Sequence, residues 1–336
     1  MKHFTWLVIF LALNLTTLAA KAVDTKRDHL VLSGPFASVS NPLIHMAATG
    51  ALSEFAHEVS FKPWSSTDQL KLMAMDKANF KADFVAMPTN VAANLYNRGV
   101  ELQLINVSVW GILWMVSRED GLTTLADFKG KEIAIPFRAD MPDIVFEELA
   151  RAQGLDPKKD FKLRYVANPL DAVKLLMLRR VDHALLAEPA ISMALRRTQS
   201  FPMKVVAPEL YRSVDLQAEW GRVFEQAPKI PQAGMVALKS VKDQPALVAA
   251  FYQAYQESTQ WVADNPKEAS ILIAKYIERL TPEAIEDSLS WVRMEVVSAA
   301  DAKQDLTRFF DKLMAHTPAL VGEKQPDDHF YYQYAP

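Results

Sequence analysis

Hydrophobic and polar residues follow two different periods along this chain. Between the polar segments, short apolar runs of strand length occur at 29–33, 59–61, 83–87, 131–135, 162–166 and 183–186. Elsewhere apolar residues recur every three or four positions, as they do on the buried face of a helix. Ile44, Ala48 and Phe55 show this spacing after the first run. Strands that alternate with helices in this way predict an α/β protein built from parallel βαβ units.

Capping residues mark where several of the predicted helices begin. Asn41-Pro42 and Asn168-Pro169 each place a capping side chain before a proline at the first helical position. Ser66, with Gln69 three residues later, fits a capping box. Beyond 245 we predict a chain that is entirely helical, with starts at Asn265-Pro266, Thr281-Pro282 and 298–301.

The run 101–117 is rich in Val, Ile, Leu and Trp and is too long for one ordinary strand. We interpret it as two strand segments that pass from one lobe of the protein to another. The last strand candidates are 203–207 and 233–238, separated by a less regular stretch with several prolines. The aromatic segment 330–334 is expected to pack onto a lobe.

The first 22 residues have the character of a secretory signal peptide. Lys2 is followed by the apolar run 4–13, and Ala20-Lys21-Ala22 supplies the small residues of a cleavage site. The apolar run is short for a membrane span, and an N-terminal anchor helix is the alternative interpretation. Cleavage after Ala22 predicts a mature protein that works in the periplasm.

Composition narrows the possible partners and chemistry. The chain has no cysteine, which excludes disulfides, thiolate metal sites and cysteine nucleophiles. Its formal net charge is −3 and it has no basic arm, so a nucleic-acid partner is not expected. With 336 residues, of which 50% are hydrophobic, the chain can form a substantial core in about two domains.

Catalytic and cofactor motifs do not occur in the sequence. The seven histidines are scattered without HExxH spacing, and His45 and His57 are too far apart on their predicted helix to share an ion. There is no GxGxxG motif and no phosphate-binding loop. We therefore expect a non-enzyme, with no catalytic residues, no metal and no cofactor.

A polar loop between the strand 131–135 and the following helix is the first candidate for ligand binding. Phe137, Arg138, Ala139 and Asp140 form this loop. Loops that follow a strand and open a helix are where α/β proteins usually hold a ligand, because the free backbone N–H groups of the helix favour an acceptor or anion. We predict that these residues form one wall of a binding cleft.

Comparable loops at other strand ends complete the candidate set. The predicted ligand-binding residues are Phe36, Ser38, Asn41, Trp64, Ser65, Ser66, Met87, Thr89, Trp110, Phe137, Arg138, Asp140, Asn168 and Glu188. For each aromatic residue, packing in the core is the alternative. Arg138 has Asp140 as an alternative partner, and Glu188 is alternatively a helix-start carboxylate stabilised by the helix dipole.

Several segments of the sequence resemble those of a known protein family. The segment 125–136, LADFKGKEIAIP, resembles a signature of ABC-transporter substrate-binding proteins, in the branch for nitrate, sulfonate, taurine and thiamine-pyrimidine precursors. Further segments agree in order and spacing, and they are 81–86, 154–157, 171–172, 181–184 and 188–189. The resemblance covers residues 29–275.

The resemblance implies a type II periplasmic binding protein fold, in which two α/β lobes close on a ligand in the cleft between them. Lobe I would contain 23–113 and the C-terminal helices and tail of 240–336, and lobe II would contain 114–239. The implied function is capture of a small organic ligand by hinge closure and its delivery, by a monomer, to an ABC permease and ATPase in the inner membrane. The alternatives are an enzyme on the same fold, acting on a small carboxylate or pyrimidine precursor, and a ligand-presenting sensor subunit.

This chain departs from the family pattern at three of its loops. Ser65-Ser66 stands where relatives often have two glycines, and 137–140 replaces a Gly-Ser turn. Ala187-Glu188-Pro189 stands where relatives have Trp-Glu-Pro. The ligand of a particular relative is therefore not carried over to this chain.

Overall fold

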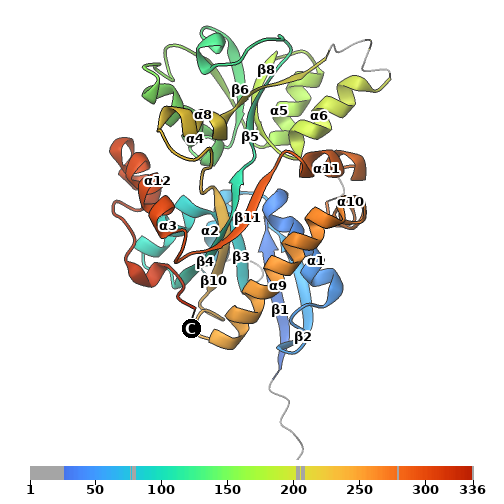
Figure 1. Cartoon of the computed structure of the whole chain (residues 1–336), viewed down its shortest axis with the longest axis vertical. Helices are drawn as coiled ribbons and strands as arrows, with labels where there is room; N and C mark the ends of the chain where they lie inside the picture. The colour runs from blue at the N-terminus through green and yellow to red at the C-terminus, as the bar shows by residue number, and fades with distance from the viewer. Residues whose placement is uncertain are drawn as a thin grey trace, which may run out of the picture.

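Two α/β lobes stacked along the long axis make up the computed structural model of this protein (Figure 1). The structure describes residues 26–75, 77, 81–201, 205, 209–277 and 280–334. The predicted signal peptide at 1–22 lies outside the described residues, as does the strand predicted at 203–207 except for residue 205.

Lobe I is built on a six-stranded sheet in which β1, β2 and β3 are parallel and β10 runs antiparallel between β3 and β4. In spatial order its strands are β11 (Arg293–Ser298), β4 (Leu102–Gly111), β10 (Ala233–Leu238), β3 (Phe84–Pro88), β1 (Arg27–Gly34) and β2 (Ala56–Pro63). Its helices are α1 (Asn41–Thr49), α2 (Thr67–Ala74), α3 (Thr89–Asn97), α9 (Pro245–Asp264), α10 (Pro266–Ala274), α11 (Pro282–Leu289) and α12 (Lys303–His316). Short 3-10 turns are η1 (Ser38–Ser40), η3 (Pro318–Val321) and η4 (Asp328–Phe330).

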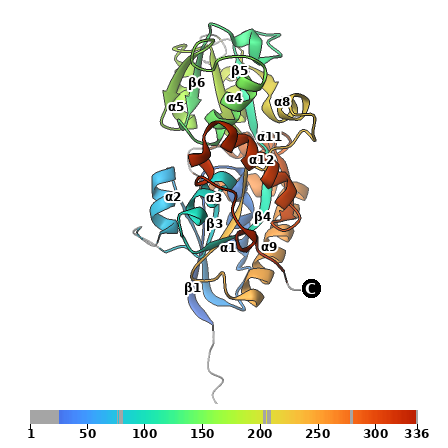
Figure 2. The same ribbon diagram turned by 90° about the vertical axis from the view of Figure 1, so that its left-hand side faces the viewer.

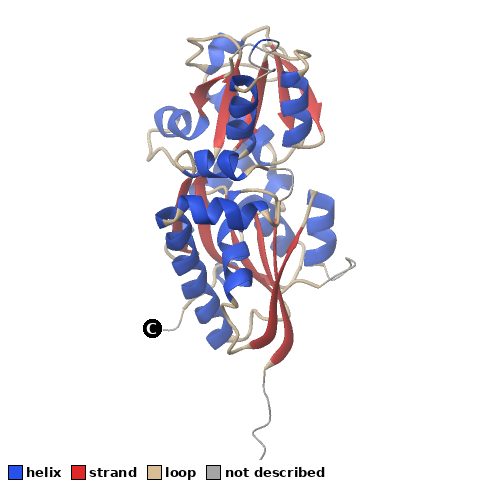
Figure 3. Ribbon diagram, turned by 90° about the vertical axis from the view of Figure 1, so that its right-hand side faces the viewer, coloured by secondary structure: helices blue, strands red, loops and turns tan. Residues whose placement is uncertain are grey.

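Lobe II is built on a five-stranded sheet of the same design. In spatial order its strands are β7 (Lys162–Val166), β6 (Glu132–Pro136), β8 (His183–Ala187), β5 (Leu113–Ser117) and β9 (Tyr211–Asp215). Its helices are α4 (Met141–Ala152), α5 (Pro169–Met177), α6 (Ala190–Gln199) and α8 (Leu216–Val223), with a 3-10 turn η2 (Leu125–Phe128). Helices cover both faces of each sheet, so the inner strands are buried on both sides (Figure 3).

The two sheets share one strand plan. In each, three parallel strands are followed by an antiparallel strand and then by a strand parallel to the first three, in the orders β2-β1-β3-β10-β4 and β7-β6-β8-β5-β9. The antiparallel strand is the one that enters from the other lobe, because β5 follows β4 directly and β10 follows α8. The predicted α/β fold with two lobes is confirmed, and so is the division of 101–117 into two strand segments. The sheets are mixed, however, where the sequence predicted parallel units.

Both connections between the lobes run side by side. The backbone of the returning chain pairs with the end of β4, where Ile230 N donates to Trp110 O over 2.8 Å and Gln232 N donates to Val109 O over 3.0 Å. Because β10 belongs to the sheet of lobe I, the chain returns to that lobe before Ala233, whereas the prediction placed this boundary at 239.

The C-terminal third differs from its prediction in one element. The prediction of an entirely helical chain beyond 245 is wrong, because Arg293–Ser298 forms β11 at the sheet edge and pairs with β4. A six-residue strand of this kind depends on its neighbour for hydrogen bonds, which local periodicity does not reveal. The aromatic tail packs onto lobe I as predicted: Phe330 and Tyr331 are buried, and Tyr332 N donates to Leu104 O over 2.9 Å.

Two of the predicted helix starts agree with the structure and two differ from it. Asn168 and Thr281 accept hydrogen bonds from the backbone N–H groups of Asp171 and Ala284, as capping residues do. Asn41 is instead the first residue of α1, because the turn η1 precedes the helix directly and Ser40 takes the capping position. The start predicted at 298–301 is a separate turn, and α12 begins at Lys303. None of the helices within the described ranges combines the length and apolar character needed to cross a lipid bilayer.

Candidate ligand-binding cleft

The loops at the carboxyl ends of the central strands meet at the junction of the two lobes. After β8, Glu188 N donates to Ile112 O over 3.0 Å, in the segment that joins β4 to β5. After β3, Thr89 N donates to Gln232 O over 3.1 Å, in the segment that returns to lobe I. One strand-end loop of each lobe therefore lies beside a connection between the lobes.

On lobe I, most of the predicted residues have protein partners and are buried. Trp64 Nε1 donates to Ala86 O over 3.0 Å, and Thr89 Oγ1 donates to Pro231 O over 2.5 Å. Trp110 Nε1 donates to Glu295 O over 2.8 Å, and Met87 is fully buried in the core. In this conformation these four side chains hold the lobe and its connections together, and a ligand role for them stays a prediction.

The loop after β1 presents a more open arrangement. Phe36 is 46% exposed, whereas Ser38 and Asn41 behind it are buried. Within the described residues Ser38 Oγ has no hydrogen-bond partner. Ser65 and Ser66 lie in the next loop and are exposed. Ser66 Oγ accepts from Gln69 N over 3.1 Å, and Ser65 N donates to the side chain of Gln69 over 2.9 Å.

A cavity of about 590 Å³ brings part of the predicted set together. Its walls come from α2 and α3 of lobe I, from the turn 137–140 of lobe II and from η3 (Figure 2 shows α2 and α3 side by side below lobe II). Of the predicted residues, the cavity is lined by Ser66, Phe137, Arg138 and Asp140. It is also lined by Asp68, Lys71, Met75, Asn90, Val91, Asn94, Leu95, Arg98, Val100, Ala139, Ala319 and Leu320.

The turn 137–140 has an unusual and well-supported backbone. Phe137 and Ala139 have φ values of 57° and 60°, a left-handed conformation that costs a non-glycine residue free energy. Hydrogen bonds hold this conformation: Phe137 N donates to Val166 O over 3.1 Å, and Ala139 N donates to Asp143 Oδ2 over 2.8 Å. Asp140 Oδ1 accepts from Met141 N over 2.8 Å at the start of α4. The turn is therefore a fixed wall of the cavity.

Arg138 projects from this turn beside an aromatic ring. Its guanidinium carbon lies 5.0 Å from the centre of the Tyr165 ring, and the Tyr165 hydroxyl donates to Asp143 Oδ1 over 3.1 Å. Burial raises the pKa of Asp143, while the Ala139 N–H and the nearby charge of Arg138 act in the opposite direction. Contact with a ring face leaves the Arg138 N–H groups available to a ligand.

Glu188 occupies a different, buried position at the junction. It forms an ion pair with Arg212 and accepts from Ser192 N over 3.1 Å in the first turn of α6. Burial raises the pKa of Glu188, and Arg212 opposes this shift. The Arg212 guanidinium in turn lies 4.1 Å from the ring centre of Trp291, which comes from lobe I. Glu188 therefore supports an interlobe contact, and Asn168 similarly serves as the cap of α5.

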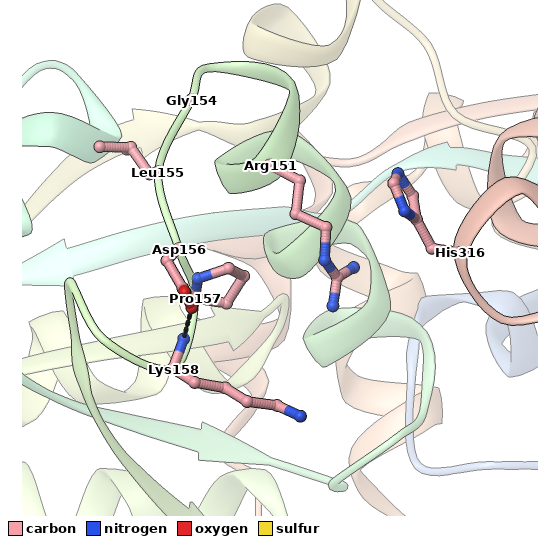
Figure 4. A pocket seen from close by; sticks show the side chains of 7 residues that line it. All are labelled: Arg151, Gly154, Leu155, Asp156, Pro157, Lys158 and His316. Atoms are coloured by element: carbon pink, nitrogen blue, oxygen red, sulfur yellow. Dashed lines mark hydrogen bonds between the residues drawn. The ribbon is translucent and has the colours of Figure 1, made fainter.

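A second hollow of about 540 Å³ lies between the end of α4 and the end of α12. Figure 4 shows the side chain of Arg151 between His316 on one side and Asp156, Pro157 and Lys158 on the other, and all of them line this hollow. None of the predicted ligand-binding residues lines it. Within the described residues there is also no group of three or more acidic or histidine side chains that could hold a metal ion.

Comparison with known proteins identifies the fold. No family model matches the sequence, and a search of curated proteins found no relative. Among solved structures, an ABC transporter protein from Parabacteroides distasonis is 23% identical, with 93% of this chain and 100% of that chain covered and a TM-score of 0.70. The periplasmic aliphatic sulphonate-binding protein SsuA from Escherichia coli is 16% identical over 92% of this chain and 94% of that one, with a TM-score of 0.66.

The periplasmic nitrate-binding protein NrtA from Synechocystis is 15% identical over 88% of this chain and 85% of that one, with a TM-score of 0.65. The chain has the fold of an ABC-transporter binding protein. The resemblance carried by 125–136 is thus confirmed at the level of the fold. In this binding-protein fold the cavity between the lobes is the candidate site, because ligand pockets form preferentially between domains and have volumes of about 300–1,000 Å³.

Some cavity residues of this binding-protein fold were missed by the sequence predictions. Asn90, Asn94 and Arg98 recur every four residues along α3, beside the apolar pair Val91 and Leu95. The spacing of these polar residues could have indicated a shared surface in the sequence, because residues four apart lie on one face of a helix. Asn94 has a structural role, since its Nδ2 donates to Ala319 O over 2.5 Å and fixes η3 on α3.

Proposed function

We propose that this protein is the solute-binding component of an ABC import system. It captures a small organic ligand between its two lobes in the periplasm and delivers it to a permease and ATPase in the inner membrane. The observation that carries this proposal is the cavity of about 590 Å³ whose walls come from both lobes. The similarity to solved binding proteins of ABC transporters supports it.

Hinge closure is the proposed mechanism. The lobes are joined by the short link between β4 and β5 and by the segment between α8 and β10, which run side by side. Two adjacent connections allow rotation of one lobe against the other while each sheet stays intact. A ligand shifts this equilibrium only by its difference in affinity for the closed and open states, so contacts to both walls of the cavity are essential.

Two ion pairs join the lobes at their surfaces. Arg196 on α6 pairs with Asp287 on α11, with 2.9 Å between Nη2 and Oδ1, and both side chains are largely exposed. Arg293 on β11 pairs with Asp215 at the end of β9 over 2.7 Å. The Arg196–Asp287 pair is of the exposed kind that contributes roughly 0–1 kcal/mol, so a ligand of ordinary affinity can outweigh this contact.

A ligand panel tests this proposal. The mature protein, purified without refolding, is first analysed by native mass spectrometry for a carried ligand and then titrated by thermal shift and calorimetry. We expect at least one small molecule to bind, and the same molecule to reduce the radius of gyration in X-ray scattering. A panel without any binder, or binding without compaction, would contradict capture by closure.

The partner is tested separately. Co-expression with candidate permease and ATPase subunits, followed by transport assays in vesicles, is expected to give ligand uptake that depends on this protein. Ligand binding with transport unaffected by its removal would instead favour a sensor subunit.

A further inference from the structure

We infer that Gln217 sets the position of the two lobes relative to each other, because its side-chain amide holds both connections between them. This inference rests on the proposed function and specifies how the movement of the lobes is controlled. Gln217 is the second residue of α8 in lobe II and is 1% exposed. It does not line the cavity of about 590 Å³, so its role is to position the lobes.

The first connection is held by both ends of the Gln217 amide. Gln217 Oε1 accepts from Ile112 N over 3.2 Å and from Leu113 N over 2.9 Å. Gln217 Nε2 donates to Leu113 O over 3.0 Å. Leu113 is the first residue of β5, so the amide pairs with this strand much as a neighbouring backbone would. The point where the chain enters lobe II is therefore fixed to that lobe.

The same amide also reaches the second connection. Gln232 Nε2 donates to Gln217 Oε1 over 3.1 Å, and Gln232 is 2% exposed. The backbone of Gln232 is bound to lobe I, because its N donates to Val109 O over 3.0 Å and its O accepts from Thr89 N over 3.1 Å. The hydrogen bond between the two glutamine side chains therefore crosses from one lobe to the other.

The partners of the two amides determine their orientation. The N–H groups of Ile112 and Leu113 require an acceptor, so Gln217 must present Oε1 to them, and Gln232 must present Nε2 to the same oxygen. Gln232 Oε1 is then left buried, without a hydrogen-bond partner among the described residues. Buried polar atoms are normally satisfied within their own domain. A buried amide bonded across the junction and unsatisfied in its own lobe is better explained by a role between the lobes than by the folding of lobe I.

A carboxylate provides a second route from lobe I to Gln217. Asp215 Oδ1 accepts from Gln217 Nε2 over 2.8 Å, and Asp215 Oδ2 pairs with Arg293 Nη2 over 2.7 Å. Arg293 lies on β11, in the sheet of lobe I. Lobe I therefore reaches Gln217 directly through Gln232 and indirectly through Asp215. Connected hydrogen bonds of this kind reinforce one another in a buried environment.

The first connection leaves very little chain between the two lobes. Gly111 pairs with Arg293 in the sheet of lobe I, whereas Leu113 is fixed to lobe II, so only Ile112 lies between them. A Cβ atom at Gly111 would lie 2.5 Å from Gln217 Cγ, which is closer than such atoms can approach. A glycine at this position therefore lets Gln217 reach the connection. Hinges are formed by a few residues at the ends of elements, as here.

The experiment measures distances between the lobes in the absence of a ligand. The chain has no cysteine, so two spin labels can be attached without removing a native one. Leu72→Cys on α2 and Lys174→Cys on α5 place one label at an exposed position of each lobe. Pulsed electron-electron double resonance on the doubly labelled full mature protein then gives the distribution of distances between the lobes.

Gln217→Met provides the main test. Methionine keeps a similar length and shape but makes none of the hydrogen bonds of the amide. We expect the population at the dominant distance of the parent protein to fall by about 2- to 10-fold relative to the other distances, the range for the loss of one net hydrogen bond.

Gln232→Met removes only the hydrogen bond that crosses between the lobes, and it leaves Gln217 on the first connection. It should shift the distances in the same direction. Because both substitutions break the same hydrogen bond, the double variant should shift the populations no further than Gln217→Met does alone.

Gln325→Met is the matched control. Gln325 Nε2 donates to Thr307 O over 3.0 Å and to Asp311 Oδ1 over 2.8 Å, and all three residues belong to lobe I. This substitution should lower the melting temperature without changing the distances between the lobes. A residue with a purely structural role at the junction would behave like this control.

The possible failures are distinguishable. Distances that are the same in the parent protein, in Gln217→Met and in Gln232→Met would overturn the inference, as would additive shifts in the double variant. If Gln217→Met does not fold, Gln232→Met decides the question by itself. These distances are measured without ligand, so a ligand panel without any binder would contradict the proposed function and leave the result on Gln217 unchanged.

Discussion

The two walls of the cleft follow the same strand plan but are built differently. On lobe I the loops after β2 and β3 present Trp64 and Thr89, which are buried and hydrogen-bonded to the protein backbone. On lobe II the loop after β6 presents Phe137 and Arg138 on a left-handed turn open to the cavity. Strand-end loops at different positions of the two sheets therefore stabilise the lobe in one case and leave side chains exposed in the other, and the loop after β1, which corresponds to the loop after β6, presents the exposed Phe36.

This difference explains why residue type alone does not identify a binding residue. A tryptophan at a strand end stabilises a lobe when a carbonyl group lies within reach of its N–H group, as Ala86 O does for Trp64. A phenylalanine held in a left-handed turn cannot turn into the core in the same way, and it remains partly exposed. The backbone conformation of the loop, more than its composition, separates the two outcomes.

The largest predicted effect is a difference in stability between substitutions on the two walls. Trp64→Ala removes a buried ring and its hydrogen bond, and we expect it to lower the free energy of unfolding by roughly 3–5 kcal/mol. Phe137→Ala, the matched change on lobe II, should cost less than about 1 kcal/mol because its ring is partly exposed. Urea titration followed by circular dichroism measures both. Equal losses would mean that the two walls are not built differently.

A second prediction concerns the buried ion pair at the junction. Arg212→Met leaves the Glu188 carboxylate buried without its cation, which should cost about 3 kcal/mol at pH 8. Burial already raises the pKa of Glu188, and loss of Arg212 raises it further. The folded state then holds the proton more tightly than the unfolded state, so stability is lost as the pH rises and the carboxyl group ionises. The destabilisation should therefore be small near pH 4 and complete at pH 8.

The double variant provides the control for this pH dependence. Adding Glu188→Gln to Arg212→Met removes the buried charge, and we expect it to restore much of the stability at pH 8 and to flatten the pH profile. A loss in Arg212→Met that is the same at both pH values would show that the contact of Arg212 with Trp291, rather than the charge of Glu188, stabilises the junction.

Much of the fold was predictable from local sequence, and the exceptions share one cause. The alternation of strands and helices up to β8 follows from periodicity and caps, as at Asn168. By contrast, β11 and the position of β10 in lobe I depend on pairing with β4, far away in the sequence. Short strands take their stability from such partners, so a single sequence does not reveal them.

The candidate site was predictable on one wall only. The turn 137–140 was found because it follows a strand and opens a helix, and the structure places it on the cavity. Asn90 and Arg98 were missed because they lie along α3, where a polar stripe resembles any solvated helix face. Only the packing of α2, η3 and the turn against that face turns it into a cavity wall.

A third prediction tests whether Asp140 binds ligand or only caps α4. Asp140→Ala removes the acceptor of Met141 N and should cost about 1 kcal/mol of stability. Asn168→Ala, the same change at the cap of α5, should cost a similar amount. If Asp140 acts only as a cap, calorimetry will show that its loss leaves the affinity for a ligand identified by the panel unchanged. A fall in that affinity, absent in Asn168→Ala, would assign a direct ligand contact to Asp140.

The smallest predicted effect concerns the backbone of the same turn. Ala139 has a φ of 60°, which costs an L-residue about 1–2 kcal/mol but glycine almost nothing. Ala139→Gly relieves this cost, and the greater freedom of glycine in the unfolded chain offsets part of the gain, so we expect a net stabilisation of about 0.5 kcal/mol. Ala167→Gly is the control in the neighbouring loop, where φ is not left-handed, and it should destabilise by a similar amount. Urea titrations of both variants measure the difference in sign. If both substitutions destabilise the protein, the left-handed backbone of Ala139 costs no free energy that glycine can relieve. The hydrogen bonds from Phe137 N and Ala139 N would then hold the turn without strain, and the cavity wall on lobe II would be as relaxed as the wall on lobe I.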